Sequence, residues 1–438
     1  MLEHLDRLVE IFNVCWPMYA AMPAVLKQAI EMSYRDCGWN LNESTNHYGE
    51  GLYPTFSDVA VNIKNVIESS EYDAENKGAY KGSLLTRISS LCNGINGMLF
   101  STSEVSQEEL FDGKAIVDLS RVGSSETKSL IMGILVLKLQ EWRMSQRVPA
   151  NSSLRHLTVL EEAHNLLRRT DALGSSEGGN LAGKSVEMLA NSIAEMRTYG
   201  EGFVIADQAP GLLDPATIRN TNTKIVMRLP DGGDRELVGG SEALNESQTA
   251  ELARLPCGVA AVYQNDWIEA VLCKVAKTSV GGGRYCYEAK VTSPLSSNRD
   301  DALDIANILS YGQKVTDERV LRDIRDMMNA CNLQPSLQVK VLRMLEDPPH
   351  DPLMKAVAPI IAALFPEERE VVAAVKEKSN DPAEWTMAIR ESLATHEGLT
   401  IPSYLSYYIT QGIIVDYLIG ELKDQESFNE WSEKGALA

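Results

Sequence analysis

Between residues 111 and 275, short runs of apolar residues alternate with stretches of helical spacing. Helices are expected at 126–146 and 184–199, each between two apolar runs. Short, wholly apolar strands that alternate with helices are typical of a parallel sheet with both faces covered. The pattern therefore predicts an α/β fold. The expected strands are 114–119, 157–160, 203–206 and 223–229, followed by a hairpin of 258–264 with 267–275.

The regions on either side of this core have a different pattern. Residues 1–110 have mainly helical spacing and contain no run that resembles a buried parallel strand. Gly281-Gly282-Gly283 indicates a linker, and the residues from 299 onward again have helical patterning. We therefore expect a helical segment at 1–110, an α/β core at 111–280, a linker at 281–298 and a helical accessory domain at 299–438.

Composition restricts the partners and the location. The net charge of −20, from 61 acidic and 41 basic residues, opposes broad adhesion to nucleic acid, so DNA would have to bind a local basic element. Seven cysteines without a Cys-x-x-Cys pair argue against a disulfide framework and a structural zinc site. No apolar run approaches the roughly 18 residues of a membrane span, and the N-terminus has no signal pattern. We expect a cytoplasmic protein without a membrane segment.

Two adjacent carboxylates, Glu161 and Glu162, directly follow the apolar run at 157–160. A strand that ends in two carboxylates is the Walker B arrangement of nucleotide-hydrolysing proteins. There the first carboxylate helps to hold Mg²⁺ on the phosphates, and the second orients or deprotonates the attacking water. Alternatively, the acidic pair caps the next helix near its positive end.

Three further segments accompany this pair. Arg197-Thr198-Tyr199-Gly200 ends a predicted helix, the strand at 203–206 is followed by Asp207-Gln208-Ala209-Pro210, and an Asn-Thr-x-Ile-x-x-Arg-Leu pattern occupies 222–229. Together with Glu-Glu-Ala-His at 161–164, these segments resemble the HerA-type branch of the FtsK–HerA motor ATPases, which is related to the type IV secretion ATPases. The resemblance covers roughly residues 111–275 and extends weakly over 1–110, which resembles the segment between Walker A and Walker B.

The resemblance implies a RecA-like sheet, ATP and Mg²⁺ as cofactors, and a role for each matching residue. Glu161 would coordinate Mg²⁺, although the family has aspartate at this position. Glu162 would be the catalytic base and Gln208 the sensor. Arg197 would be the arginine finger offered to the adjoining subunit of a homo-oligomeric ring. Arg228 is a second candidate for that role, or else a solvated arginine at a strand end.

The phosphate-binding Walker A loop is not evident. The pattern G-x-x-x-x-G-K-S occurs once, at 178–185, with Lys184 and Ser185 at its end. It follows a charged loop instead of a buried strand, and it comes after Walker B, so we reject it. The predicted sheet therefore lacks its P-loop strand. The chain is expected to be the C-terminal part of an ATPase whose front comes from another polypeptide, an upstream reading frame or a longer precursor, or else to be a decayed ATPase.

Three functions remain open. The first is a HerA-like motor that translocates or remodels DNA, in DNA processing or phage defence, beside a partner effector such as a nuclease. The second is a non-hydrolysing assembly protein that keeps the ring-forming surfaces. The third is a secretion-type motor that moves protein cargo. His164 is expected to cap or couple locally rather than to bind a metal, because no second His or Cys lies at ligand spacing.

Overall fold

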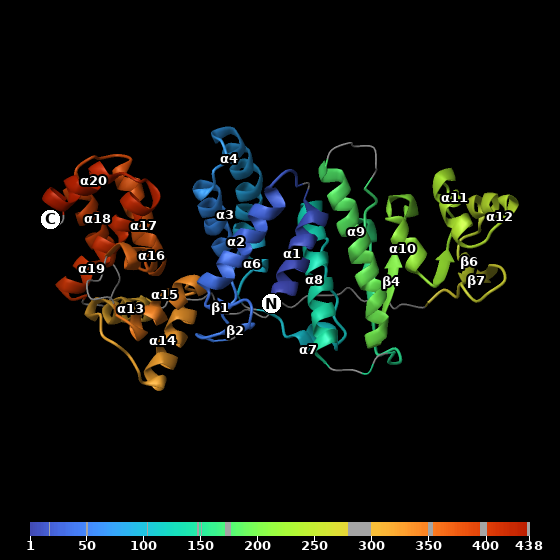
Figure 1. Cartoon of the computed structure of the whole chain (residues 1–438), viewed down its shortest axis with the longest axis horizontal. Coiled ribbons are helices and arrows are strands. Elements are labelled where there is room, and N and C mark those ends of the chain that lie inside the picture. The colour runs from blue at the N-terminus through green and yellow to red at the C-terminus, as the bar shows by residue number, and fades with distance from the viewer. Residues whose placement is uncertain are drawn as a thin grey trace. The chain divides into compact units, whose positions relative to one another are not determined.

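The computed structural model describes most of the chain and divides it into two compact units (Figure 1). The first unit comprises Met1–Gln28, Ser70–Tyr80 and Ser103–Cys286, and the second comprises Ala29–Ser69, Lys81–Thr102 and Tyr287–Ala438. The expected linker at 281–298 lies outside the described residues. The structure describes residues 1–16, 18–49, 51–102, 104–146, 149, 151–170, 177–278, 299–348, 354–394 and 401–435. For residues 177–181 it describes the backbone without the side chains.

The first unit contains both helices and strands. Its helices are α1 (Leu2–Cys15), α4 (Ala74–Tyr80), α7 (Gln107–Phe111), α8 (Ser125–Ser145), α9 (Glu177–Glu195), α10 (Pro215–Asn220), α11 (Gly232–Ser241) and α12 (Glu246–Glu251). Its strands are β3 (His156–Glu161), β4 (Glu201–Ala206), β5 (Thr223–Val226), β6 (Val259–Gln264) and β7 (Val271–Lys274). Single helical turns lie at η2 (Ala163–Asn165), η3 (Met196–Tyr199), η4 (Pro210–Leu212) and η5 (Leu252–Arg254).

The strands form two separate sheets. β3 and β4 are parallel neighbours, in register from His156 opposite Glu201 to Glu161 opposite Ala206. β5, β6 and β7 form an antiparallel sheet, in which β6 and β7 are the two arms of the expected hairpin. The α/β class is therefore confirmed, as are the strands near 157–160 and 203–206. Among the described residues, however, the parallel part of the sheet contains only these two strands.

The expected strand at 114–119 is wrong. These residues have no regular structure, and Ile116 and Val117 are 95% and 49% exposed. An apolar run becomes a strand only when a neighbouring strand pairs with its backbone N–H and C=O groups. None of the described strands pairs with this run. The run therefore has the composition of a buried strand without the partner that would bury it.

One face of the β3–β4 pair packs on helices. α1, α8 and α9 lie side by side (Figure 1), and Gly133 of α8 brings two of them close together, since a Cβ there would come within 2.5 Å of the Ile11 side chain of α1. Helix α8 begins where the Ser124 hydroxyl accepts a hydrogen bond from the backbone N–H of Thr127. Arg143 of α8 reaches the sheet, where its Nε donates to Glu201 Oε2 at 2.8 Å.

Glu201 joins both strands of the parallel pair to this helix layer. Its other oxygen, Oε1, accepts hydrogen bonds from His156 Nδ1 at 2.9 Å and Thr158 Oγ1 at 2.6 Å. The Glu201 side chain is fully buried, and that of Arg143 is 5% exposed. Arg143 also binds Asp112 and the carbonyl oxygen of Phe111. A buried carboxylate is thus satisfied by one cation and two polar groups, as buried charges require.

The opposite face of the β3–β4 pair is exposed. Leu157 and Val159 of β3 lie opposite Gly202 and Val204 of β4 on this face. Leu157, Val159 and Val204 are 50%, 55% and 43% exposed. The expectation of a sheet covered on both faces therefore fails within the described residues, because none of their helices covers this side.

Glu242, which follows α11, is buried without a hydrogen-bond partner for either carboxyl oxygen. Burial raises its pKa from 4.5 to about 7, although the positive charge of Lys224 opposes the shift. Because the folded-state pKa is the higher one, the contribution of Glu242 to stability is complete below pH 4.5 and is lost as the pH rises to about 7. Above pH 7, the ionised carboxylate costs about 3 kcal/mol.

We therefore expect the stability of Glu242→Gln, relative to that of the wild type, to increase as the pH rises. From pH 5 to pH 8, the difference in free energy of unfolding between variant and wild type should shift by about 2.5 kcal/mol in favour of glutamine. Urea unfolding at both pH values measures this shift. Glu236→Gln, on the exposed side of α11, is the matched control and should show no such trend. A difference independent of pH would contradict the assignment.

The second unit is mainly helical. Its core contains the fully buried Trp385, Phe365 and Ile413. The helices α16 (Met354–Leu364) and α19 (Ser403–Val415) pack closely where Gly412 meets Ile361. The elements are α2 (Met22–Asp36, which begins in the first unit), β1 (Trp39–Asn40), β2 (Thr45–Asn46), α3 (Phe56–Ser69), η1 (Lys81–Leu85), α5 (Thr86–Cys92), α6 (Gly94–Leu99), α13 (Arg299–Tyr311), α14 (Glu318–Ala330), α15 (Pro335–Glu346), α16 (Met354–Leu364), α17 (Pro366–Lys376), α18 (Pro382–Ala394), α19 (Ser403–Val415), η6 (Asp416–Glu421), α20 (Gln425–Glu430) and η7 (Trp431–Gly435).

Candidate active site

The carboxyl ends of the two parallel strands bring the principal predicted residues together. Because Glu161 lies opposite Ala206, the residues that follow, Glu162 on one side and Asp207 and Gln208 on the other, lie at the same edge of the sheet. Gln208 Nε2 donates a hydrogen bond to Glu162 Oε1 at 2.7 Å. Two residues 46 positions apart in the sequence, predicted as catalytic base and sensor, are therefore in direct contact.

The backbone at Glu162 has a conformation that side chains disfavour. Its φ of +49° and ψ of +48° are left-handed, which costs a residue with a Cβ about 1 kcal/mol. The turn is held by Asn165, whose backbone N–H and side-chain amide both donate to the Glu162 carbonyl oxygen at 2.9 Å. Leu166 and Leu167, fully buried just beyond, anchor the segment. The turn leaves the Glu162 carboxylate 46% exposed at the strand end.

A second carboxylate and a histidine complete the cluster. The Asp207 side chain is only 3% exposed, and its Oδ2 accepts a hydrogen bond from the backbone N–H of His164 at 2.8 Å. The His164 ring nitrogen Nδ1 lies 2.9 Å from the same oxygen and 3.5 Å from Glu162 Oε2. The local coupling expected of His164 is therefore present, and its partner is Asp207.

Glu161 is the last residue of β3 and is exposed. In the described part of the chain its carboxylate has no hydrogen bond or ion pair, so both oxygens are available to a cation or to water. Carboxylate oxygens are the ligands that Mg²⁺ prefers. The position and chemistry of Glu161 therefore fit a ligand of Mg²⁺, an ion that usually keeps several water ligands in proteins.

The two arginines lie away from this cluster. Arg197 belongs to η3, which precedes β4, so it lies at the opposite end of that strand from Gln208, roughly 17 Å along a six-residue strand. Gly200 ends η3 at φ +81°, where a Cβ would come within 2.6 Å of the Ser153 carbonyl oxygen. Arg228 follows β5 in the other sheet. Both arginines are exposed, and neither side chain has an ion pair or hydrogen bond among the described residues.

The sequence at 178–185 does not form a loop. It lies inside α9, which begins at Glu177. Ser185 is buried and donates a hydrogen bond to Glu10 of α1, and Lys184 faces solvent. A Walker A loop must wrap around phosphate before its helix begins, with the lysine and serine directed at the ligand. This geometry supports our rejection of the 178–185 pattern.

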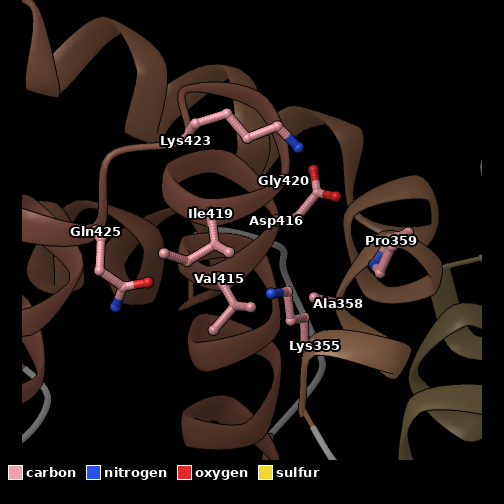
Figure 2. Close-up of a pocket in the computed structure, with 9 residues that line it drawn as sticks. All are labelled: Lys355, Ala358, Pro359, Val415, Asp416, Ile419, Gly420, Lys423 and Gln425. Carbon is pink, nitrogen blue, oxygen red and sulfur yellow. The ribbon is translucent and has the colours of Figure 1, made fainter. Parts of the chain in front are cut away.

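A cavity of about 330 Å³ lies in the second unit (Figure 2). Lys355 and Pro359 of α16 line one side, and Asp416, Lys423 and Gln425 line the other. Burial raises the pKa of Asp416, although Arg369, with Nε 3.0 Å from Asp416 Oδ2, opposes the shift. None of the residues predicted from sequence lines this cavity.

Comparisons with known proteins agree with the motifs. No family model matches the chain. The chain is 27% identical over 154 residues to the DNA double-strand break repair helicase HerA of Sulfolobus acidocaldarius, a match that covers 34% of this chain and 29% of that protein. The predicted resemblance to HerA is confirmed. The chain thus spans less than a third of the length of this HerA relative.

A solved structure with some similarity is that of VirB4 of Thermoanaerobacter pseudethanolicus. It has 14% sequence identity and a TM-score of 0.46, over 63% of this chain and 70% of the VirB4 chain.

The contact of Asp207 with His164 was not predicted from the sequence. Both carry typical ligand atoms, and Asp207 directly precedes the predicted sensor. The available signal was that parallel strands end at one edge, which places residue 207 beside residues 162–164.

In the ranges that the structure describes, no helix combines the length and apolar character needed to cross a bilayer.

Proposed function

We propose that this chain supplies the Walker B carboxylates and the sensor of an ATP-hydrolysing, HerA-like motor that translocates or remodels DNA, in DNA processing or phage defence. The contact between Glu162 and Gln208, at the adjoining ends of two parallel strands, is the observation that carries the proposal. An acidic pair that merely capped the next helix would have no need of an amide from the neighbouring strand.

Each residue of the cluster has a part in the proposed reaction. Bound Mg²⁺–ATP would supply a γ-phosphoryl group whose charge the metal partly neutralises. Glu161, with both oxygens available, would hold the ion. Glu162 would accept a proton from the attacking water, and Gln208, bonded to Glu162 Oε1, would fix the orientation of that carboxylate and of the water.

The phosphate-binding loop would come from a segment outside the described residues. Among those residues, 178–185 is helical and the cluster contains carboxylates, one imidazole and one amide, with no cation to hold phosphate. The exposed apolar face of β3 and β4 and the unpaired run at 114–119 support this, because a further strand and its covering helix would bury both.

Arg197 would act across a subunit boundary, and Arg228 is the second candidate for the same role. Both are exposed and lie away from Glu162 of their own chain, as an arginine that serves a neighbouring site must. A homo-oligomeric ring would bring one of them to the adjoining nucleotide, where a cation stabilises the transition-state charge. A partner effector such as a nuclease would act on the DNA that the ring moves.

A second candidate is a type IV secretion-like ATPase that moves protein cargo. The net charge of −20 favours it, because an acidic surface repels DNA. A non-hydrolysing scaffold is the remaining alternative.

The test is ATP hydrolysis by the chain purified from its native source with the components that co-assemble with it. We expect Mg²⁺-dependent turnover that increases severalfold with double-stranded DNA. Lys184→Ala should leave this rate within twofold of wild type, because Lys184 faces solvent from a helix. Turnover without DNA stimulation would support protein cargo, and no turnover would support the scaffold. Loss of turnover in Lys184→Ala would identify 178–185 as the nucleotide cradle.

A further inference from the structure

Three side chains with metal-binding atoms converge at the edge of the parallel strand pair. Glu162 and His164 come from the turn after β3, and Asp207 comes from the end of β4. One ligand atom from each residue lies within 4.8 Å of the other two. Residue spacing alone did not indicate a metal site because the third ligand belongs to a different strand.

The two separations that involve His164 match those around a single ion. A divalent transition metal binds imidazole nitrogen and carboxylate oxygen at about 2.0–2.2 Å, so two ligands at octahedral or tetrahedral angles lie roughly 2.9–3.5 Å apart. His164 Nδ1 lies 2.9 Å from Asp207 Oδ2 and 3.5 Å from Glu162 Oε2. These two separations fit ligands of one ion, and the ligand atoms of Glu162 and Asp207 lie within 4.8 Å of each other. A bound ion would replace the ring hydrogen bond of His164.

The remaining polar atoms of the cluster hold the ligands in place. Gln208 donates to Glu162 Oε1, which leaves Oε2 facing the histidine. The backbone N–H of Ala209 donates to Asp207 Oδ1 at 2.9 Å, and that of His164 donates to Oδ2 at 2.8 Å. Hydrogen bonds of this kind orient metal ligands and increase affinity. Asp207 is almost fully buried, so its carboxylate is desolvated before an ion arrives.

We propose that Glu162, His164 and Asp207 form a binding site for a divalent transition metal such as Mn²⁺ or Zn²⁺. An imidazole nitrogen beside two carboxylate oxygens suits these ions, whereas Mg²⁺ prefers an all-oxygen set. The site is distinct from the magnesium position proposed at Glu161, but it shares Glu162 with the proposed hydrolytic site and uses the Oε2 atom of that carboxylate. Its existence does not depend on ATP hydrolysis, so this proposal and the proposed function fail separately.

Titration of the full chain with Mn²⁺ alone, followed by electron paramagnetic resonance, tests the site. Mn²⁺ is the preferred probe because thiolates, including that of the exposed Cys257, are softer ligands that favour Zn²⁺. We expect one ion per chain, with a nitrogen coupling from an imidazole ligand in the pulsed spectrum. A tenfold excess of Mg²⁺ should not displace the ion.

Variants locate the site. His164→Ala should abolish the nitrogen coupling and weaken binding at least tenfold, and Glu162→Gln should weaken it similarly while keeping the coupling. Because the Glu162 side chain is about half exposed, we expect Glu162→Gln to fold. Metal binding by this variant therefore tests the site even when His164→Ala does not fold. His47→Ala, which removes an exposed histidine 3.1 Å from Glu346, is the control and should bind as wild type does. Absence of stoichiometric binding, or unchanged affinity in Glu162→Gln, would overturn the proposal.

Discussion

Glu162→Gln should lower the rate of ATP turnover by the assembled motor by at least a hundredfold. Glutamine keeps the size of the side chain and can still contact Gln208, but it cannot accept a proton from water. Removal of a general base typically costs a factor of 10² to 10⁴ in rate. Steady-state phosphate release at saturating ATP measures the loss, and equilibrium binding of ATP should change little.

Glu187→Gln is the matched control. Glu187 is an exposed glutamate of α9 outside the cluster, and its variant should turn over at the wild-type rate. Undiminished turnover in Glu162→Gln would show that another group takes the proton, and the assignment of Glu162 as the base would be wrong. A similar rate loss in both variants would indicate a general effect of lost negative charge.

Arg143→Leu should lower the free energy of unfolding by about 3 kcal/mol. Leucine fills part of the same space but leaves the fully buried Glu201 without its cation. The loss of one partner from a buried ion pair costs about 3–5 kcal/mol, and the lower value applies because His156 and Thr158 still bind Glu201. Urea unfolding at pH 7, followed by circular dichroism, measures the change.

A second substitution isolates the unpaired charge. In Arg143→Leu/Glu201→Gln, the neutral amide can still bind its two remaining partners, and we expect at least half of the lost stability to return. Arg322→Leu, at an exposed position of α14, should change stability by less than about 0.5 kcal/mol. A loss in Arg143→Leu no larger than in this control would contradict the structural role of the Arg143–Glu201 pair.

The fold was predictable where local pattern and pairing partner were both present. β3 and β4 were expected from apolar runs, and each found the other as its neighbour. The run at 114–119 has the same composition but is unpaired and exposed. A local sequence pattern indicates which residues would suit a buried strand. Burial itself requires a neighbouring strand from a distant segment, and the local pattern does not show whether such a strand pairs with it.

The candidate site was predictable only in part, for a similar reason. The sequence placed Glu162 and Gln208 just after two predicted strands, and the rule that parallel strands end at one edge accounts for their contact. The pairing of His164 with Asp207 required knowledge of side-chain direction after each strand, which depends on the left-handed turn at Glu162. The sequence did not show that turn, since glutamate is not a residue that usually signals it.

The left-handed turn at Glu162 also indicates that this position is not optimised for stability alone. A sequence selected only to fold would have glycine or asparagine at position 162, where either would relieve the backbone. Glutamate instead keeps an acidic group at the strand end, and the chain gives up a small part of its stability to hold it there.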